Sequence, residues 1–581
     1  MKTQSLPTPV LESLEPRLAP AGIVNITVSG GVLTLTGDAS ANNIEVVDTG
    51  YGAWTISGVG TQFTLNGTGA PFSSTTIAVQ NSIKASLGGD NDNLQLNGLE
   101  MRGTVSILGG DGKDALSLFQ CSTLGAVIFD GGIANDDLSI TEGFHGGITF
   151  KGGTGLDAVT LVDSTFTKAV NLNFGTGSST FNLSGNTTLH AGLAILATGI
   201  AGDGHNYDVS NTELIIAGAV SIKATGAGAM SLRLGNFVTD SIRVAGGFAV
   251  TGGTGADSVI FSREVMIGGA FSFNAGAGGN GISSFDVSLL TLGSFSYTGT
   301  TGTDALSLTS SGGQIAIAKG LTVKAGEGIN SLNVMAPSVT IGGAVNLAGG
   351  GGGDSFAIGG DFVSINGALT FKLGNGYNTG TFNPVVGRVG NVSYTGGTAE
   401  DLLDIGKFDG TSTEITVLGN ITSVMGTGNA DLSIRDASVL GSIMHSSNAT
   451  VTDNFYIRES YVQGKVTGNL LGSAGAFVQV QDSILDMAYS VSTGAGGDEV
   501  VLDTVAGSKV SIFRGAVKIL LGAGADIVTA GGTVAAANRG SLFESTILID
   551  GGADSDIANL ETGYFNSFAF PLQTVAVETV N

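Results

Sequence analysis

The segment GGDGKDALSL at residues 109–118 shows the pattern that most of the chain repeats: glycines at its first, second and fourth positions, aspartate at the sixth, then alternating apolar and polar residues. Further copies of this G-G-x-G-x-D pattern begin at residues 88, 131 and 152, so that neighbouring copies are 21 or 22 residues apart. Between residues 88 and 551 there are about 20 copies of about 24 residues each. A repeat of this length is typical of a solenoid, in which each unit completes its core by stacking on the next.

Each repeat combines short strands with glycine turns. The alternation that follows the motif places every second side chain on one face, as in a strand with one buried side. A second stretch between motif copies has the same period, for example IAGAVSI at residues 216–222. Glycine suits the corners because it adopts positive φ without steric cost, and no segment has the 3.6-residue period of a helix over three turns.

We therefore expect an all-β fold: a single-stranded, right-handed parallel β-solenoid of about 20 coils with about 24 residues per coil. A series of antiparallel β-domains is the alternative, but independent domains would not keep one spacing so evenly.

Composition excludes several protein classes. Of 581 residues, 96 are glycine and only 12% are charged, whereas 42% are apolar, which is not typical of a disordered chain. The single cysteine, Cys121, cannot form an internal disulfide, and we expect it to be a small buried residue. The chain contains no run of 18 apolar residues, so the sequence predicts no transmembrane helix. A net charge of −25 without basic runs argues against nucleic acid as a partner.

The repeat array, residues 88–559, has a different segment at each end. Residues 1–22 are polar and interrupted by proline, so we expect a disordered segment. Residues 23–87 are β-patterned without the regular motif, include the only tryptophan, and are expected to form an N-terminal cap. Residues 560–581 are aromatic and apolar, and are expected to form a C-terminal cap that protects the open strand edges of the last coil.

The N-terminal segment contains LESLEPRLAPA at residues 11–21. This stretch resembles the LEPR-XLL segment of large surface and secreted proteins of planctomycete-type bacteria. The match is close over LEPR at 14–17 and departs afterwards, where LAP at 18–20 replaces the leucine-rich end of the family segment. The resemblance implies an export or sorting tag, and therefore an extracellular or cell-surface location in a bacterium.

The glycine–aspartate motif resembles the nonapeptide of RTX, or haemolysin-type, calcium-binding β-rolls. In that family the repeats run in tandem, and carboxylates of neighbouring turns share a calcium ion. Here the motif occurs once per coil, so an ion would have to be shared between successive coils at one corner. The resemblance implies calcium where carboxylates are densest, with Asp90, Asp92, Asp111, Asp114, Asp136, Asp137 and Asp157 as candidate ligands. From the residues alone we expect no cofactor and solvated turn aspartates at this corner, with calcium as the alternative.

The sixth motif position alternates between aspartate and asparagine in the middle of the array. The residues there are Asp257, Asn280, Asp304, Asn330, Asp354, Asn378 and Asp401, whereas early copies place Asn93, Asp114, Asp136 and Asp157 at this position. Carboxylates about 4.8 Å apart on neighbouring coils repel one another, and an intervening asparagine separates them and shares hydrogen bonds. Over residues 252–401 we therefore expect a structural Asp/Asn ladder rather than a calcium column.

Enzyme signatures are sparse. No histidine has a metal-ligand spacing, and we expect the four of them at the surface or in turns: His145, His190, His205 and His445. The serious enzyme alternative is a polysaccharide lyase or glycoside hydrolase, which needs paired carboxylates, often with arginine or lysine, on one solvent-facing side. The best local cluster is DNFYIRESYVQGK at 453–465, with Asp453, Tyr456, Arg458, Glu459 and Tyr461. Catalysis would require such groups from adjacent coils to converge on one face.

The sequence thus predicts a secreted or cell-surface β-solenoid with a structural or adhesive role and no catalytic activity. Its expected partners are cell-surface, matrix or polysaccharide components, or further copies of the chain. A carbohydrate-active enzyme and a calcium-binding RTX-like protein are the two alternatives.

Overall fold

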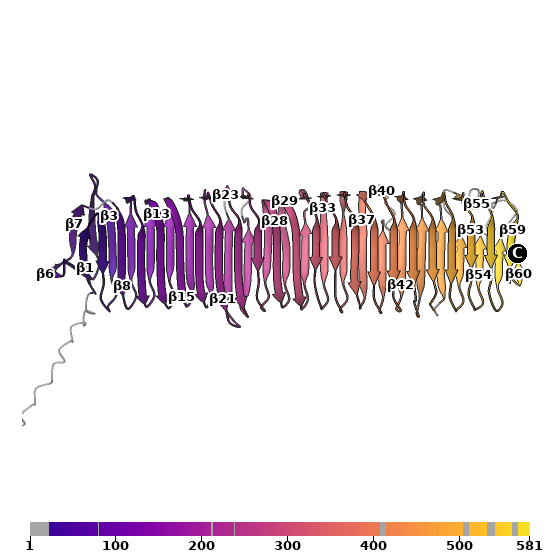
Figure 1. Ribbon diagram of the computed structural model, residues 1–581, viewed down its shortest axis with the longest axis horizontal. Coiled ribbons are helices and arrows are strands. Elements are labelled where there is room, and N and C mark those ends of the chain that lie inside the picture. Colours follow the sequence, from indigo (N-terminus) through magenta and orange to yellow (C-terminus); the bar gives the residue numbers. More distant parts are fainter. Residues whose placement is uncertain are drawn as a thin grey trace, which may run out of the picture. The chain divides into compact units, whose positions relative to one another are not determined.

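The computed structural model describes residues 22–78, 81–210, 213–236, 239–406, 414–472, 475–503, 510–531, 541–560 and 567–581. Within them the protein is all-β, with 60 strands and no helix. Parallel strands stack as a β-solenoid of about 19 turns, about 24 residues apart, which confirms the predicted fold (Figure 1). The chain divides into two compact units, Met1–Gly175 and Thr176–Asn581. The LEPR segment lies outside the described residues. No helix in the described ranges is long and apolar enough to cross a membrane.

The first unit begins with antiparallel strand pairs: β1 with β2, β3 with β4, β4 with β7, and β5 with β6. These strands are β1 (Gly22–Ser29), β2 (Val32–Thr36), β3 (Asn43–Asp48), β4 (Ala53–Gly58), β5 (Thr61–Leu65), β6 (Thr68–Phe72) and β7 (Ser74–Ala78). Two of them, β2 and β3, also pair in parallel with β8 and β9. The antiparallel region is thereby joined to the first regular coil.

The coils of the first unit form three parallel ladders. The first ladder, which follows the motif, contains β3, β9 (Asn93–Asn97), β12 (Ala115–Phe119), β14 (Asp137–Thr141) and β16 (Asp157–Val162). The second contains β10 (Glu100–Met101), β13 (Ser122–Ile133), β15 (Phe144–Thr154) and β17 (Thr165–Phe166). The third contains β2, β8 (Ser82–Gly88), β11 (Val105–Asp111) and the later parts of β13 and β15. The last strand is β18 (Val170–Thr176).

The second unit has the same three ladders. The first contains β19 (Ser179–Ser184), β22 (Gly204–Ser210), β25 (Ala229–Leu234), β28 (Ser258–Ala277), β29 (Gly281–Thr301), β30 (Ala305–Thr309), β33 (Ser331–Ile341), β35 (Ser355–Ile365), β37 (Asn378–Val389), β39 (Asp401–Ile405), β42 (Ala430–Arg435), β45 (Asp453–Arg458), β48 (Ala476–Gln481), β51 (Glu499–Leu502), β54 (Ile527–Ala530), β57 (Ile557–Leu560) and β60 (Thr579–Val580).

The second ladder of this unit adds β20 (Thr188–Leu189), β23 (Leu214–Ile216), β26 (Ser241–Val244), β31 (Gln314–Ile317), β40 (Glu414–Val417), β43 (Ala437–Val439), β46 (Tyr461–Val462), β49 (Ile484–Leu485), β52 (Ser511–Phe513), β55 (Ser541–Phe543) and β58 (Ser567–Phe568). The third adds β21 (Leu193–Gly199), β24 (Val220–Gly226), β27 (Phe248–Thr251), β32 (Leu321–Lys324), β34 (Val345–Ala348), β36 (Leu369–Gly374), β38 (Val392–Gly396), β41 (Ile421–Met425), β44 (Ile443–Ser447), β47 (Val466–Leu470), β50 (Tyr489–Thr493), β53 (Val517–Leu520), β56 (Ile547–Asp550) and β59 (Leu572–Val575). In the C-terminal segment, β58, β59 and β60 extend all three ladders in parallel.

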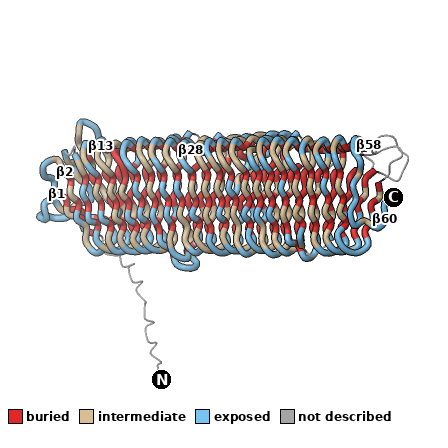
Figure 2. Tube along the Cα trace, turned by 45° about the vertical axis from the view of Figure 1, so that its right-hand side comes forward, coloured by how far each residue is buried: buried red, intermediate tan, exposed pale blue. Residues whose placement is uncertain are grey.

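Alternation along each strand decides the core. In β42, Leu432 and Ile434 are 0% exposed, whereas Asp431 and Arg435 beside them face outward and are half-buried. Figure 2 shows the same alternation of buried and less buried residues from coil to coil. Each coil therefore has one apolar interior and one polar exterior, and every outward side chain lies about 4.8 Å from its counterparts in adjacent coils.

The three glycines of the motif are required by contacts within and between coils. Gly110 has a φ of +128°, and a Cβ there would lie 1.8 Å from the carbonyl oxygen of Gly88 in the preceding coil. A Cβ on Gly112 would lie 2.3 Å from another carbonyl oxygen of that coil. A Cβ on Gly109 would lie 2.3 Å from Oδ2 of Asp114, so this glycine provides the space for the motif aspartate.

Substitution of Gly110 by alanine is expected to destabilise the first unit by more than about 3 kcal/mol, because backbone must move away from backbone. Gly98 is the matched control, since it also has positive φ, +68°, but a Cβ there would have no atom within 4 Å. Gly98→Ala should cost only about 1 kcal/mol for the left-handed conformation. Thermal and urea unfolding followed by circular dichroism measure both variants. Equal losses would show that close coil contact is not what selects glycine at residue 110.

Candidate functional site

The motif aspartates form a column of buried side chains, each of which lies immediately before a strand of the first ladder. We call this column the buried ladder. In the first unit, Asp92, Asp114, Asp136 and Asp157 are 0–2% exposed. Oδ1 of Asp92 accepts the backbone amide of Asn42 at 2.7 Å. Each later aspartate accepts the amide of the aspartate one coil earlier, at 2.9 Å in all three cases. The same bonds join Asp498, Asp526 and Asp556 in the second unit.

Two expectations about this corner are wrong. The four aspartates are not solvated, because the corner directs them into the coil, where they satisfy amides that would otherwise be buried without an acceptor. The ladder position in the first motif copy is Asp92 and not Asn93. The copy at 88 reads GGDND and the copy at 109 reads GGDGKD, so the first has one residue fewer before its aspartate. Counting to the sixth motif position therefore reaches Asn93 instead of Asp92.

The alternating stretch of the second unit forms the expected hydrogen-bonded ladder. The backbone amide and Nδ2 of Asn330 both donate to Oδ1 of Asp354, at 3.2 and 2.8 Å. Nδ2 of Asn330 also donates to the carbonyl oxygens of Gly326 and Gly328. The asparagine side chain therefore adds a second hydrogen bond to the carboxylate that already accepts the asparagine backbone amide.

The seven candidate calcium ligands do not lie together. Asp92, Asp114, Asp136 and Asp157 point inward, whereas Asp90 and Asp111 are exposed. Asp137 is half-buried on the outside, and its carboxylate lies 3.0 Å from Nζ of Lys113. In the described part of the chain, no group of three or more histidine, cysteine, aspartate or glutamate side chains could hold a metal ion.

Burial makes the ladder carboxyl groups weak acids. Desolvation raises the pKa of Asp92 and Asp157 to about 6, and that of Asp114 and Asp136 to about 7. The charges of neighbouring ladder aspartates add to the increase at Asp114 and Asp136. Oδ2 of each of the four is buried without a hydrogen-bond partner, which explains why the ionised form is disfavoured.

The histidine expectation is wrong for three residues. His145, His205 and His445 are 0% exposed, whereas His190 lies at the surface. Each buried imidazole lies beside a core polar atom: Thr123 Oγ1 at 3.0 Å, Ser179 Oγ at 2.8 Å and Asp453 Oδ1 at 3.4 Å, respectively. Inward strand positions thus accept histidine when a hydroxyl or carboxyl group lies close to it. Cys121 is buried as predicted.

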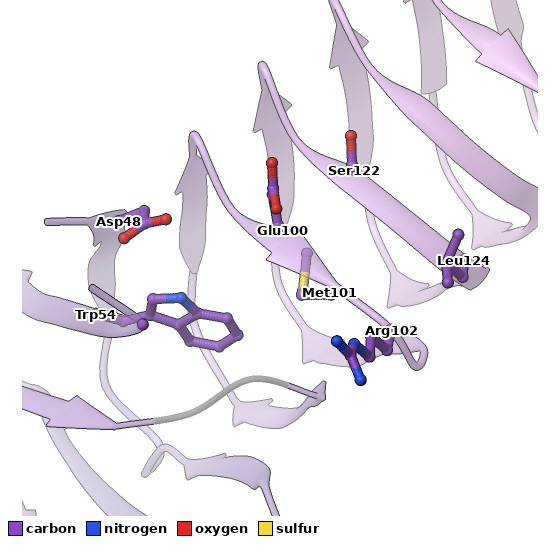
Figure 3. A pocket seen from close by; sticks show the side chains of 8 residues that line it. Asp48, Trp54, Glu100, Met101, Arg102, Ser122 and Leu124 are labelled. Carbon is purple, nitrogen blue, oxygen red and sulfur yellow. The ribbon is translucent and has the colours of Figure 1, made fainter. Parts of the chain in front are cut away.

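A recess of about 540 Å³ lies in the first unit where the second ladder begins (Figure 3). It is lined by Asp48, Gly52, Trp54, Glu100, Met101, Arg102, Ser122 and Leu124. Trp54, from β4, is 2% exposed, so its ring fills the end of the core rather than offering a binding surface.

A second polar cluster lies on the outward face of β39, β42 and β45, three neighbours in the first ladder of the second unit. The register aligns Asp404 with Ser433 and Tyr456, and aligns Asp431 with Asn454. Together with Leu402 and Arg458 these residues line a recess of about 310 Å³, which we call the outer-face recess. Acidic, arginine and tyrosine side chains from three adjacent coils therefore converge on one face.

Sequence reasoning found only part of this cluster. Of the five residues noted at 453–465, only Tyr456 and Arg458 line the recess. Asp453 is 2% exposed and faces the core, while Glu459 pairs with Arg435 at 2.9 Å and Tyr461 donates to Asp486.

The two carboxylates that complete the recess, Asp404 and Asp431, were missed. Asp404 lies 29 residues before Ser433, and Ser433 lies 23 residues before Tyr456. Because these two spacings differ, a single repeat length does not align the three residues. Aligning each motif copy separately, and then following the alternation along its strand, could have predicted that they share a face.

Contacts inside the recess hold some groups firmly. Nδ2 of Asn454 donates to Oδ1 of Asp431. The guanidinium carbon of Arg458 lies 4.8 Å from the centre of the Tyr456 ring. Burial raises the pKa of Asp404 to about 6, with a contribution from the charge of Asp431, whose own pKa burial also raises. Near neutral pH, Asp404 can therefore take up or release a proton.

The fold defines this chain as a β-solenoid repeat protein. Comparison with known proteins gave no significant match to a family model, a curated protein or a solved structure.

The free energy of unfolding is expected to fall as pH rises from about 4 to about 7. Aspartate has a pKa near 3.9 in an unfolded chain, so the folded protein retains protons there that the unfolded protein has released. Burial of His145 lowers its pKa to about 4 and acts in the opposite direction, but ladder aspartates are more numerous. The melting temperature should be several degrees higher at pH 5 than at pH 8.

The double variant Asp114→Asn/Asp136→Asn should flatten this dependence and raise the melting temperature at pH 8, because asparagine accepts the same amide without ionising. Asp111→Asn, at an exposed position of the same corner, is the control and should change the profile far less, because its charge is only a minor cause of the raised pKa of Asp114. A melting temperature that rises from pH 5 to pH 8 in the unmodified protein would contradict the buried-ladder account.

Proposed function

We propose that the protein is a secreted or cell-surface bacterial β-solenoid with a structural and adhesive role. The observation that carries the proposal is the hydrogen-bonded stacking of coils. The carboxyl groups of Asp114, Asp136 and Asp157 each bind the backbone amide of the preceding coil, so outward side chains are held on a fixed lattice with about 4.8 Å between coils. A rigid lattice of side chains suits repeated contacts with a repeating polymer, since many weak contacts add in affinity.

Two further features support an extracellular partner. The LEPR stretch at residues 14–17 resembles an export or sorting tag. The acidic, charge-poor chain lacks the basic clusters that nucleic acid requires. Cell-surface, matrix and polysaccharide components are therefore the proposed partners, together with other copies of the chain.

Fractionation of the producing bacterium tests this role. The chain is expected in the medium or the envelope fraction, and replacing residues 14–17 by alanines should shift it to the cytoplasm. Alanine replacement of residues 3–6, in the same segment, is the matched control and should not change its location. Recovery of the unmodified chain in the cytoplasm alone would contradict the proposal.

A carbohydrate-active enzyme is a second candidate, because the required convergence of side chains occurs in the outer-face recess. Asp404 would serve as the acid that protonates the leaving oxygen, and Asp431 as the base that activates water. One strand separation and two residues of rise place their Cα atoms about 8 Å apart. Two side chains that point the same way from one sheet face keep roughly the spacing of their Cα atoms, and inverting glycosidases hold their two carboxyl groups about 6.5–9.5 Å apart.

Hydrolysis of neutral polysaccharides, measured as new reducing ends, tests the enzyme candidate. We expect the unmodified chain to release none, in keeping with an adhesive role. Release that Asp404→Asn abolishes and Asp286→Asn preserves would establish the enzyme instead. Asp286 is an exposed aspartate of the same unit that pairs with Arg263.

A further inference from the structure

The outer-face recess contains polar groups that the protein itself leaves without partners. Within the described residues, the Asp404 carboxyl, the Tyr456 hydroxyl and the Arg458 guanidinium make no hydrogen bond or ion pair. Ser433, which is 4% exposed and also lines the recess, has a buried Oγ with no partner. Nε of Arg458 and Oγ of Ser433 are buried without a partner, which costs free energy, and a ligand that bonds to them would recover it.

Several other outward arginines of the same unit pair with an acidic side chain. Arg243 pairs with Glu264 at 3.1 Å, and Arg435 pairs with Glu459 at 2.9 Å, in each case one coil away. Arg458 has only the ring of Tyr456 beneath it, which orients the guanidinium while leaving its donors unused. Within the described residues Arg388 also has no ion pair, but it is exposed, whereas Arg458 is half-buried in the recess.

The mixture of charges selects the kind of ligand. A cation attracted by Asp404 and Asp431 would meet the positive charge of Arg458, and an anion attracted by Arg458 would meet the two aspartates. A neutral molecule rich in hydroxyl groups avoids both conflicts, because each hydroxyl can donate to a carboxylate and accept from a guanidinium or hydroxyl. The volume of about 310 Å³ is at the small end of ligand sites, which span about 300–1,000 Å³.

We propose that the outer-face recess binds one neutral sugar unit of a glycan. Its hydroxyl groups donate to Asp404 and Asp431 and accept hydrogen bonds from Arg458 and Tyr456, and the rest of the glycan lies over the open outer face. This inference rests on the proposed adhesive function and supplies its ligand class. The site is formed by strand register alone, so it is present before the ligand arrives and needs no loop closure.

Isothermal titration of the full chain with neutral oligosaccharides tests the proposal. The probes are hexasaccharides of glucose in α- and β-linkage, of mannose, of galactose and of N-acetylglucosamine. A galacturonate hexasaccharide and calcium chloride serve as the anionic and cationic comparisons. At least one neutral hexasaccharide is expected to bind, and Arg458→Gln should weaken it at least about tenfold through the loss of charged hydrogen bonds.

Two further variants keep the result interpretable. Tyr456→Phe removes a single hydroxyl and should weaken binding severalfold without affecting the melting temperature. Arg243→Gln and Tyr461→Phe are the matched controls on the second ladder, and both should bind like the unmodified chain. Arg458→Gln is included only if its melting temperature is within a few degrees of that of the unmodified chain; otherwise Tyr456→Phe decides.

Three outcomes would overturn the proposal: no binding of any neutral hexasaccharide, unchanged binding in Tyr456→Phe and Arg458→Gln, or a preference for galacturonate or calcium. The proposed function fails separately. A chain found only in the cytoplasm that still binds a neutral glycan through Arg458 contradicts the location and not the site. A chain in the envelope that binds no glycan contradicts the site and not the location.

Discussion

The fold depends on one hydrogen bond repeated from coil to coil, in which a buried carboxyl or amide oxygen accepts the backbone N–H of the preceding coil. That N–H lies where the chain turns into the first ladder, and without an acceptor it would be buried and unsatisfied. Where a ladder side chain supplies this acceptor, it belongs to the next coil, as in Asp114 Oδ1 bonded to the amide of Asp92. The bond therefore fixes the height and register of successive coils, and the glycines of the motif are there to let the coils approach closely enough for it to form.

This arrangement places ionisable groups in the interior, and different stretches of the chain deal with that cost differently. In the first unit, consecutive aspartates lie one above another, and desolvation combined with their mutual repulsion gives the pKa of about 7 at Asp114 and Asp136. Between Asp257 and Asp401 in the second unit, asparagine is interposed and donates Nδ2 to the next carboxylate, as Asn330 does to Asp354. Asparagine accepts the amide equally well and carries no charge, so alternation keeps the stacking bond while reducing the repulsion.

The same stacking organises the outer surface. Because inward positions are occupied by core residues such as Leu403, Leu432 and Phe455, their neighbours in sequence all point outward at one height per coil. Asp404 and Arg458 are far apart in the chain, yet they line a single recess because three strands are in register. A rigid ladder can thus assemble a polar site without a loop, and the composition of that site is set by a few outward residues.

The sequence by itself determined the all-β solenoid, its spacing of about 24 residues and the Asp/Asn ladder, because period-2 alternation and glycine corners are local properties that do not depend on distant contacts. Only the tertiary structure decided which way each corner side chain points and which residues share a face. Asp92 rather than Asn93 belongs to the ladder, His145 is buried, and Asp404 joins Tyr456, although none of this follows from motif counting. Coil lengths vary, with 29 residues from Asp404 to Ser433 and 23 from Ser433 to Tyr456. The alignment of residues across coils is set by hydrogen bonding between strands, and this pairing cannot be predicted from a single repeat length.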